Sequence, residues 1–353
     1  MILLRIILFP FSILYDLITR FRNHLFDIGY TRSFSFETFV INVGNLRVGG
    51  TGKTPHVEYI IRLLKDNDRV AVLSRGYGRK TKGIIIANEL ADAEAIGDEP
   101  YQYYLKYGKE ITVAVGEERA LAIPTILYER PETTTIILDD AYQHRYVKPD
   151  LNILLTEYSK PFYDDYVLPA GRLRESRKGA RRADIILVTK CLSDLGSDEM
   201  EAIRYNIKKF SGKDVPIFFT GISYLGPRQF FGNPRNLTKG EEVIVLAGIA
   251  NPQYFYSEIR RSFKVKEEFT FKDHHNFKMT DIQKVVTESK RQMAKPVIIT
   301  TEKDMVKLNA RLIETGLEDV SWFYIPIEIS FLNGKQNFDQ LIFKYSDQIK
   351  KTI

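Results

Sequence analysis

Short apolar runs alternate with stretches of helical periodicity through the first half of the chain. The apolar runs predict strands at residues 36–43, 69–74, 83–87, 111–115, 134–138 and 151–155. Apolar positions three and four apart predict helices at residues 55–64, 99–107 and 117–128. Strands that alternate with helices are typical of a mostly parallel sheet with helices on both faces. Ligands bind such α/β sheets beyond the carboxyl ends of the strands.

A second α/β set follows. Its strands are predicted at residues 216–220, 243–247 and 297–301, its helices at residues 251–262 and 280–293, and a closing helix at residues 337–353. We therefore expect three parts: an N-terminal helix (residues 1–32), a P-loop-type domain (33–215) and a smaller second α/β domain (216–353).

The first residues have a different character. Residues 1–15 are almost wholly apolar, interrupted by Arg5 and Pro10, and Arg20 and Arg22 follow. A spanning helix needs about 20 apolar residues, and a signal peptide needs a small-residue cleavage site, which is not found before Arg20. The pattern predicts an interfacial helix with its apolar face in lipid. A helix packed on the protein's own core and a single membrane span are the alternatives.

Composition narrows the function classes only a little. The chain has 353 residues, of which 44% are hydrophobic and 27% charged, and its net charge is +6. This charge permits an acidic partner, such as a nucleotide or a lipid surface, without selecting one. The single cysteine, Cys191, excludes an intrachain disulfide and a cysteine-based zinc site, and its apolar neighbours predict a core residue.

The most informative stretch is GNLRVGGTGKT at residues 44–54. A strand, a glycine-rich turn and a helix in this order aim backbone N–H groups and a helix N-terminus at a phosphate. The candidate nucleotide-binding residues are Arg47, Val48, Gly49, Gly50, Thr51, Gly52, Lys53 and Thr54. Lys53 would reach the β- and γ-phosphates and the Thr54 hydroxyl would bind Mg²⁺, although the usual spacing has glycine where Arg47 stands. A glycine-rich turn without a ligand is the alternative.

A second motif has the form of a metal-binding strand end. Apolar residues 136–138 run into Asp139 and Asp140. Phosphoryl transfer needs a carboxylate of this kind to hold Mg²⁺ opposite the Thr54 hydroxyl. Adjacent carboxylates on a strand point to different sides, so one can serve the metal and the other a second group. A solvated turn after a strand is the alternative.

Three further motifs have two readings each. Asp98 in GDEP stands at a predicted helix start, where it would cap the helix, act as a general base, or do both. His274 and His275 lie side by side in a polar loop, which would be a metal site or an ordinary surface loop. Neighbouring histidines seldom bind one metal together. Arg172 and Arg174 belong to the densest basic cluster, which would hold a phosphate or form a solvated face.

Taken together, these motifs resemble those of the tetraacyldisaccharide 4'-kinase family of lipid A synthesis. The matching stretches, in the family's order, are VGNLRVGGTGKTP, LSRGYGR, GDEP, ILDDAYQHR, LPAGRLRES, VTKC, KDHHNF and TTEKD. They span residues 42–304. The family's loop commonly lacks the first glycine of the usual motif, and in this chain Arg47 stands at that position. The family usually has glycine and phenylalanine where this chain has Ala141 and Tyr142, but both acids remain.

The resemblance implies an activity. The γ-phosphoryl of ATP, with Mg²⁺, would pass to the 4'-hydroxyl of a tetraacyl glucosamine disaccharide 1-phosphate and give the 4'-phosphorylated lipid IVA product. The enzyme would act at the cytoplasmic face of the inner membrane of a Gram-negative bacterium. It would contact the acceptor lipid and, through its N-terminal helix, the membrane surface, and neither a nucleic acid nor a protein partner is implied.

The resemblance also implies residue roles. Lys53 would act on the phosphates, Asp98 would take the proton of the sugar hydroxyl, and His274 would pair with Asp98 when the second domain closes over the cleft. Further candidate substrate contacts are Arg75, Arg172, Arg174 and Glu175.

Two other classes remain open. One is a membrane-attached P-loop ATPase or GTPase switch without a small substrate. A protein that recognises guanine would need a T-K-x-D loop after a strand. In one candidate loop Leu192 replaces the aspartate, and in the other, residues 301–304, there is an extra residue. The second class is a scaffold that holds a nucleotide without turning it over.

Overall fold

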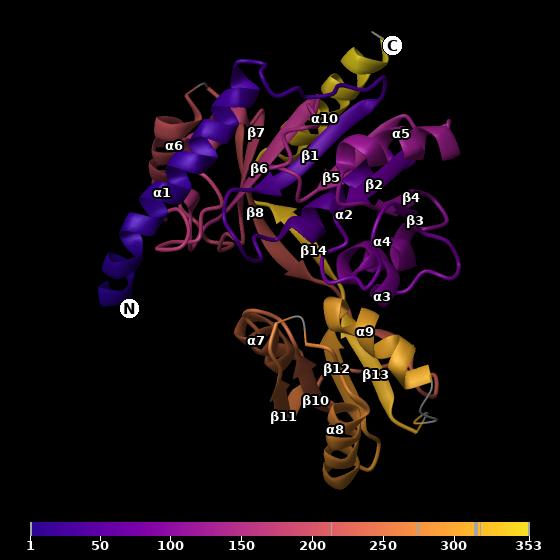
Figure 1. Cartoon of the computed structure of the whole chain (residues 1–353). Coiled ribbons are helices and arrows are strands. Elements are labelled where there is room, and N and C mark those ends of the chain that lie inside the picture. The colour runs from indigo at the N-terminus through magenta and orange to yellow at the C-terminus, as the bar shows by residue number, and fades with distance from the viewer. Residues whose placement is uncertain (1, 213, 274, 314–316, 318, 352–353) are drawn as a thin grey trace. The chain divides into compact units, whose positions relative to one another are not determined.

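The chain folds into two compact units in the computed structural model (Figure 1). The structure describes residues 2–351 apart from residues 213, 274, 314–316 and 318. Unit 1 comprises Met1–Ala91, Tyr103–Ile222 and Ile329–Ile353, and unit 2 comprises Asp92–Gln102 and Ser223–Glu328.

Unit 1 is built around a mostly parallel sheet that has nine strands in the described part of the chain. Across the sheet the strands lie in the order β14 (Ile327–Phe331), β8 (Ile217–Tyr224), β7 (Ile185–Thr189), β6 (Leu151–Glu157), β1 (Phe39–Asn45), β5 (Thr135–Asp139), β2 (Val70–Ser74), β4 (Thr112–Val115) and β3 (Ile85–Ile86). Among the strand pairs of this sheet whose register is described, only β3 and β4 are antiparallel. The central strands are buried on both faces, as parallel strands covered by helices must be.

Helices cover both faces of this sheet. They are α1 (Ile2–Asp27), α2 (Lys53–Leu64), α4 (Asp98–Tyr107), α5 (Arg119–Glu129), α6 (Ser197–Ser211) and α10 (Lys335–Lys350), with 3₁₀ turns η1 (Phe162–Asp164) and η2 (Arg177–Arg182). Successive side chains of a strand point to opposite faces. Ile41 and Val43 of β1 therefore pack in one core with α2, α4 and α10, whereas Val40 packs in another with α5.

Unit 2 has a smaller sheet, with five strands among the described residues. Their order is β11 (Lys264–Thr270), β10 (Glu242–Ala247), β12 (Val297–Thr301), β13 (Ser321–Ile325) and β9 (Arg228–Phe231), and β9 alone among them pairs antiparallel. The helices of this unit are α3 (Ala93–Ile96), α7 (Gln253–Ser262), α8 (Met279–Gln292) and α9 (Glu302–Ile313). Apolar residues from α8 and α9 pack with β10 and β12 in its core.

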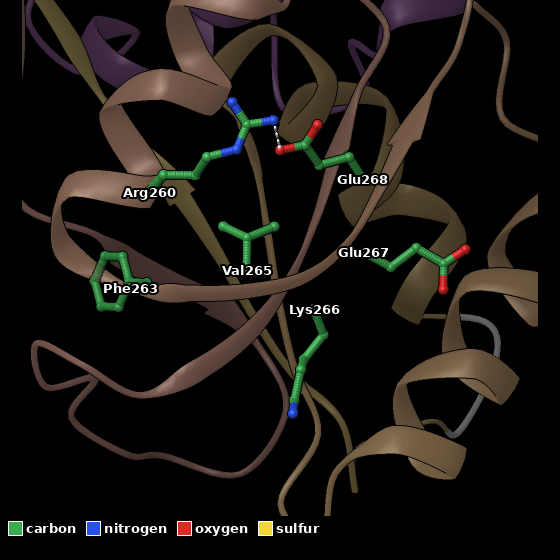
Figure 2. Close-up of a pocket in the computed structure, with 6 residues that line it drawn as sticks. All are labelled: Arg260, Phe263, Val265, Lys266, Glu267 and Glu268. Atoms are coloured by element: carbon green, nitrogen blue, oxygen red, sulfur yellow. Dashed lines mark ion pairs between the residues drawn. The ribbon is translucent and has the colours of Figure 1, made fainter.

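The edge strand β11 carries an open surface pocket of about 470 Å³. Figure 2 shows Arg260 and Glu268 pointing toward each other as an ion pair of 2.5 Å, while Lys266 and Glu267 point away from it. The pairing of β10 with β11 also shifts register after Val243. Charges and a register shift discourage pairing with a foreign strand, so this surface protects the sheet edge.

The two units do not follow the predicted boundaries. The strand β8, expected to open the second domain, pairs with β7 in the sheet of unit 1. The closing helix α10 buries Phe338 and Ile342 against the core around β1, so it also belongs to unit 1. Residues 92–102, expected in the P-loop domain, belong to unit 2. The chain leaves unit 1 twice and returns to it each time, so no single boundary in the sequence separates the two units.

The helix α1 has an inverted amphipathic pattern. Its polar residues Ser12, Asp16, Thr19 and Asn23 are buried or half-buried against the rest of unit 1. Its apolar residues are 45–64% exposed, and these are Ile6, Ile7, Phe9, Phe11, Ile13, Leu14, Leu17, Ile18 and Phe21. An apolar face turned away from the protein fits the predicted interfacial helix and not one packed on its own core. In the described residues, none of the helices combines the length and the apolarity that crossing a bilayer requires.

Candidate active site

The loop between β1 and α2 has the conformation of a phosphate-binding turn. Gly52, at the start of α2, has φ 81°, and Gly49 has φ 117°, values that side-chain-bearing residues rarely adopt. Lys53 begins the helix, so the first N–H groups of α2 lie at the end of the loop. This arrangement suits an anion because the helix N-terminus carries partial positive charge.

Side chains from outside the loop orient its peptide groups. The three consecutive carbonyl oxygens of residues 50–52 each accept one such hydrogen bond. The donors are Lys190 Nζ at 2.5 Å, Thr189 Oγ1 at 2.8 Å and His56 Nδ1 at 2.6 Å. In a trans peptide the C=O and N–H groups point in opposite directions. Holding these carbonyls therefore turns the following N–H groups away from the three donors. The Thr51 N–H bonds to the Gly49 carbonyl oxygen at 3.0 Å, which leaves the Gly52 and Lys53 N–H groups for an anion.

His56 has the tautomer that this role needs. Burial lowers the pKa of His56 to about 4, and the bond to the Gly52 carbonyl only partly offsets that effect. A carbonyl can only accept, so Nδ1 carries the proton, and Nε2 accepts from the Thr220 hydroxyl at 2.9 Å. The loop is thereby tied through α2 to β8.

Asp139 and Asp140 lie at the carboxyl end of β5, next to the loop's strand. Asp139 is buried and accepts a hydrogen bond from the Tyr103 hydroxyl at 3.1 Å. Asp140 has φ 55°, a left-handed conformation that turns its side chain differently from that of Asp139. Arg174 donates two hydrogen bonds of 2.9 Å to the Asp140 carboxylate, and Lys53 Nζ lies 3.6 Å from it.

The charges around Asp140 keep it ionised. Burial would raise its pKa, but the positive charges of Lys53 and Arg174 outweigh that effect and hold the pKa below its usual value. The ionised Asp140 carboxylate, the Asp139 carboxylate and the Thr54 hydroxyl all offer oxygen atoms as ligands. Mg²⁺ typically uses one or two protein carboxylates together with substrate phosphates, so these residues fit that ion.

The candidate substrate residues fall into different environments. Arg75 and Arg172 are exposed. Glu175 is only 3% exposed, and Arg182 donates to both of its carboxylate oxygens at 2.7 and 2.9 Å. The Arg47 side chain lies 2.7 Å from the Asp165 carboxylate, so its charge is directed to that loop. A contact of Arg47 with the nucleotide therefore stays a prediction that concerns its backbone.

Asp98 lies in unit 2. It forms an ion pair of 2.9 Å with Lys307, which is on α9, and Lys307 also donates to the His275 carbonyl oxygen at 3.1 Å. His274 lies outside the described residues. Asp98 was predicted in the P-loop domain, but it belongs to unit 2. His275 has a local partner, since its Nε2 lies 2.9 Å from the Asp281 carboxylate.

Two motifs have structural roles. Asp304 of TTEKD is fully buried and accepts hydrogen bonds from the Gly248 N–H at 2.8 Å and the Thr301 hydroxyl at 2.7 Å. Its carboxylate holds the ends of β10 and β12 together and is not presented to a guanine. Cys191 is buried, which raises the pKa of its thiol to about 12, so its prediction as a core residue is confirmed.

Comparison with known proteins assigns the family. A model of the tetraacyldisaccharide-1-P 4'-kinase family, LpxK, matches residues 4–346. The chain belongs to this family. The tetraacyldisaccharide 4'-kinase of Flavobacterium johnsoniae is 44% identical over 347 residues, which cover 97% of each chain. That of Cytophaga hutchinsonii is 40% identical over 337 residues, covering 95% of this chain and 94% of its own.

A solved LpxK supports the fold. The crystal structure of the "apo" form of LpxK from Aquifex aeolicus in complex with ATP, at 2.2 Å resolution, is 33% identical. It matches with a TM-score of 0.75 and covers 97% of this chain and 99% of its own. The predicted resemblance to the family and the predicted α/β class with a large mostly parallel sheet are confirmed.

Sequence reasoning missed several residues of this LpxK-family site. His56 is ordinary in sequence. Thr189 and Lys190 lie in the matched VTKC stretch, but nothing in their spacing links them to the loop. Arg119 is 4% exposed, and burial together with the Arg75 charge lowers its pKa to about 10. His144 lies inside the matched ILDDAYQHR stretch, and burial and three nearby arginines lower its pKa to about 4, so it is uncharged at neutral pH.

Proposed function

We propose that the protein is an ATP-dependent kinase that phosphorylates the 4'-hydroxyl of a tetraacyl glucosamine disaccharide 1-phosphate, a step of lipid A synthesis. Membership of the tetraacyldisaccharide 4'-kinase family supports this activity. The observation that carries it is the geometry at the end of β1 and β5. There, Lys53 and an ionised Asp140 lie 3.6 Å apart beside a loop whose N–H groups are oriented for phosphate.

The residues of unit 1 would bind and activate ATP. The N–H groups of Gly52 and Lys53 and the Lys53 ammonium would hold the β- and γ-phosphates, where charge shifts during transfer. Thr54, Asp139 and Asp140 would hold Mg²⁺. When bound, this ion neutralises charge on the phosphate oxygens. Because Arg174 holds Asp140 through two hydrogen bonds, the carboxylate is already oriented before the nucleotide binds.

Asp98 of unit 2 would act on the acceptor, with His274 as its partner. The 4'-oxygen forms a bond to the γ-phosphorus while the bond from that phosphorus to the bridging oxygen breaks and ADP leaves. The hydroxyl proton passes to Asp98. A carboxylate of ordinary pKa is a weak base, but the loose transition state needs little proton removal early. The Lys307 ammonium, 2.9 Å away, would hold the Asp98 carboxylate in position.

The enzyme would work at a membrane surface, on the cytoplasmic face of the inner membrane of a Gram-negative bacterium. The exposed apolar face of α1 supports this location, since its residues from Ile6 to Phe21 would enter the lipid. Arg5 and Arg20 are exposed on the same helix and would meet anionic headgroups. An acyl-chain-bearing acceptor is held in the same lipid layer. Arg75 and Arg172 are exposed and would be available to its 1-phosphate.

The test is transfer of label from [γ-³²P]ATP to the disaccharide 1-phosphate in detergent micelles. The matched control is the same acceptor without its 4'-hydroxyl. We expect Mg²⁺-dependent labelling of the complete acceptor and none of the 4'-deoxy acceptor. Label on the 4'-deoxy lipid would assign another acceptor position. ADP release that is equal with and without acceptor would instead favour a P-loop ATPase.

A further inference from the structure

The inward face of α1 contacts the two segments that flank the Asp140 carboxylate. The Tyr15 hydroxyl donates to the Arg174 carbonyl oxygen at 3.2 Å, and Ser12 Oγ accepts from the Ala170 N–H at 2.8 Å. Arg22 donates to the Gln143 carbonyl oxygen at 3.0 Å. These are polar contacts at specific atoms, whereas a helix that served only to reach lipid would need none of them.

A further contact of α1 begins a continuous hydrogen-bonded path. Asn23 Nδ2 donates to Glu175 Oε2 at 2.8 Å. The other oxygen of Glu175 accepts from Gln143 Nε2 at 3.0 Å, and Gln143 Oε1 accepts from Arg174 at 3.2 Å. Arg174 then holds both oxygens of Asp140. The path therefore runs from α1 to the carboxylate that faces Lys53.

The residues of this path hold one another in fixed orientations. Glu175 is nearly fully buried, and its two oxygens are shared among Asn23, Gln143 and Arg182, so its orientation is fixed by all three. The same Gln143 amide also donates to the Asn45 carbonyl oxygen at the end of β1, at 3.0 Å. Gln143 thus joins the start of the phosphate loop, the Arg174 guanidinium and Glu175. Buried networks of this kind rigidify the groups they connect.

We propose that Asn23 of α1 is a positioning residue for phosphoryl transfer, acting through Glu175 and Gln143 on the Arg174–Asp140 pair. The face of α1 that reaches lipid and the face that supports the site then belong to one helix, so docking at the membrane and site geometry are coupled. This inference rests on the proposed kinase function only for its turnover measurement.

The test is a double-mutant cycle with Asn23→Ala and Gln143→Ala in the full-length chain. Alanine favours the helix, so α1 should still form. Small displacements at a transfer site are costly, and we expect Asn23→Ala to lower kcat about tenfold and leave the unfolding temperature and vesicle binding unchanged. His24→Ala, at the exposed neighbouring position, is the matched control and should stay within twofold of the parent. Tyr15→Phe, which deletes one hydroxyl, is a second and milder variant with a smaller loss of kcat expected.

The cycle separates positioning from a general structural effect. If Asn23 acts through Gln143, Asn23→Ala costs nothing more once Gln143→Ala is present. Two losses that multiply, or a kcat for Asn23→Ala within twofold of the parent, would overturn the proposal. The same four proteins are titrated with ATP and Mg²⁺ without acceptor, where the same non-additivity is expected for the dissociation constant. If the parent does not phosphorylate the lipid, the proposed function fails, and this binding cycle still decides the role of Asn23.

Discussion

Lys53 and Asp140 face each other across 3.6 Å, and each is held by a different part of unit 1. Lys53 begins α2, while Arg174 holds the Asp140 carboxylate through two hydrogen bonds. At this scale the site is a set of charges fixed before the nucleotide binds. Fixed charges lower a barrier because they need no rearrangement during the reaction.

Lys53→Met should lower turnover about 100-fold, the order lost with one electrostatic donor to a transition state. The protein should remain folded, since Lys53 packs in no core. The measurement is label transfer at saturating ATP, with Lys109→Met as the control at an exposed lysine of the same unit. Near-parent turnover of the Lys53 variant would refute the phosphate-loop assignment.

The buried His56 should make stability depend on pH. Its folded pKa of about 4 is below the usual 6.5, so protons bind the unfolded chain preferentially. Stability from this group is complete above pH 6.5 and is lost as the pH falls toward 4, by about 3 kcal/mol at most. His56→Gln keeps a donor and an acceptor but does not titrate. Chemical unfolding from pH 7 to 4 should therefore show a shallower loss for this variant, and parallel curves would contradict the assignment.

At the scale of the elements, the end of one strand supports a loop that is far away in sequence. β7 ends at Thr189, which reaches the Thr51 carbonyl across 138 residues of sequence. Lys190 follows with φ 55°, and this turn brings its ammonium to the Gly50 carbonyl. A left-handed conformation is unusual for lysine, and such strain is retained where the surroundings fix it.

Thr189→Val should weaken ATP binding about fivefold. Valine has nearly the same shape, so the change removes one hydrogen bond of about 1 kcal/mol and frees the loop carbonyl to turn inward. The measurement is the ATP dissociation constant by calorimetry. Thr125→Val, at a half-buried position of α5 away from the loop, is the matched control and should bind ATP normally. Unchanged affinity in the Thr189 variant would show that the loop holds its shape alone.

The outward face of α1 should control membrane binding. Replacing Leu14, Ile18 and Phe21 by Gln removes three apolar side chains that are 59–64% exposed, so folding should not suffer. Each such side chain contributes about 1.5–3 kcal/mol when fully buried in an apolar medium. We expect the fraction bound to anionic vesicles to fall at least tenfold in sedimentation. The control replaces Leu90, Leu121 and Tyr128, which are exposed elsewhere, and binding equal to this control would place the attachment on another surface.

At the scale of the whole molecule, the chain separates its chemistry between two units. Unit 1 carries the phosphate loop, the candidate metal acids and α1, and unit 2 carries Asp98 with Lys307. In the proposed reaction, ATP would bind to unit 1 and Asp98 of unit 2 would act on the acceptor. The chain passes between the units four times: after Ala91, after Gln102, within β8 and within β14. The strands β8 and β14 are neighbours in the sheet.

The local parts of this arrangement could be predicted from sequence, and the long-range parts could not. The strand, loop and helix around Lys53 and the acids after β5 are continuous motifs with a fixed physical purpose. The return of α10 to unit 1 depends on the burial of Phe338 beside β1, which no local pattern encodes. The periodicity of α1 predicted an apolar face in lipid, but not that Asn23 on the other face would bond Glu175. In the sequence, His56 cannot be told from any other helical residue. Its role depends on the hydrogen bonds of its two ring nitrogens with the Gly52 carbonyl and the Thr220 hydroxyl.

The most direct test of the account is the effect of Asp98→Asn on transfer, measured together with ATP binding. A general base contributes about 10²–10⁴-fold, so label transfer to the acceptor lipid should fall at least about 100-fold while the ATP dissociation constant stays within twofold. Glu94→Gln, which also weakens an ion pair of unit 2, controls for the loss of charge and should transfer normally. Transfer by Asp98→Asn at the parent rate, or a parallel loss of ATP binding, would contradict the division of the reaction between a nucleotide unit and an acceptor unit.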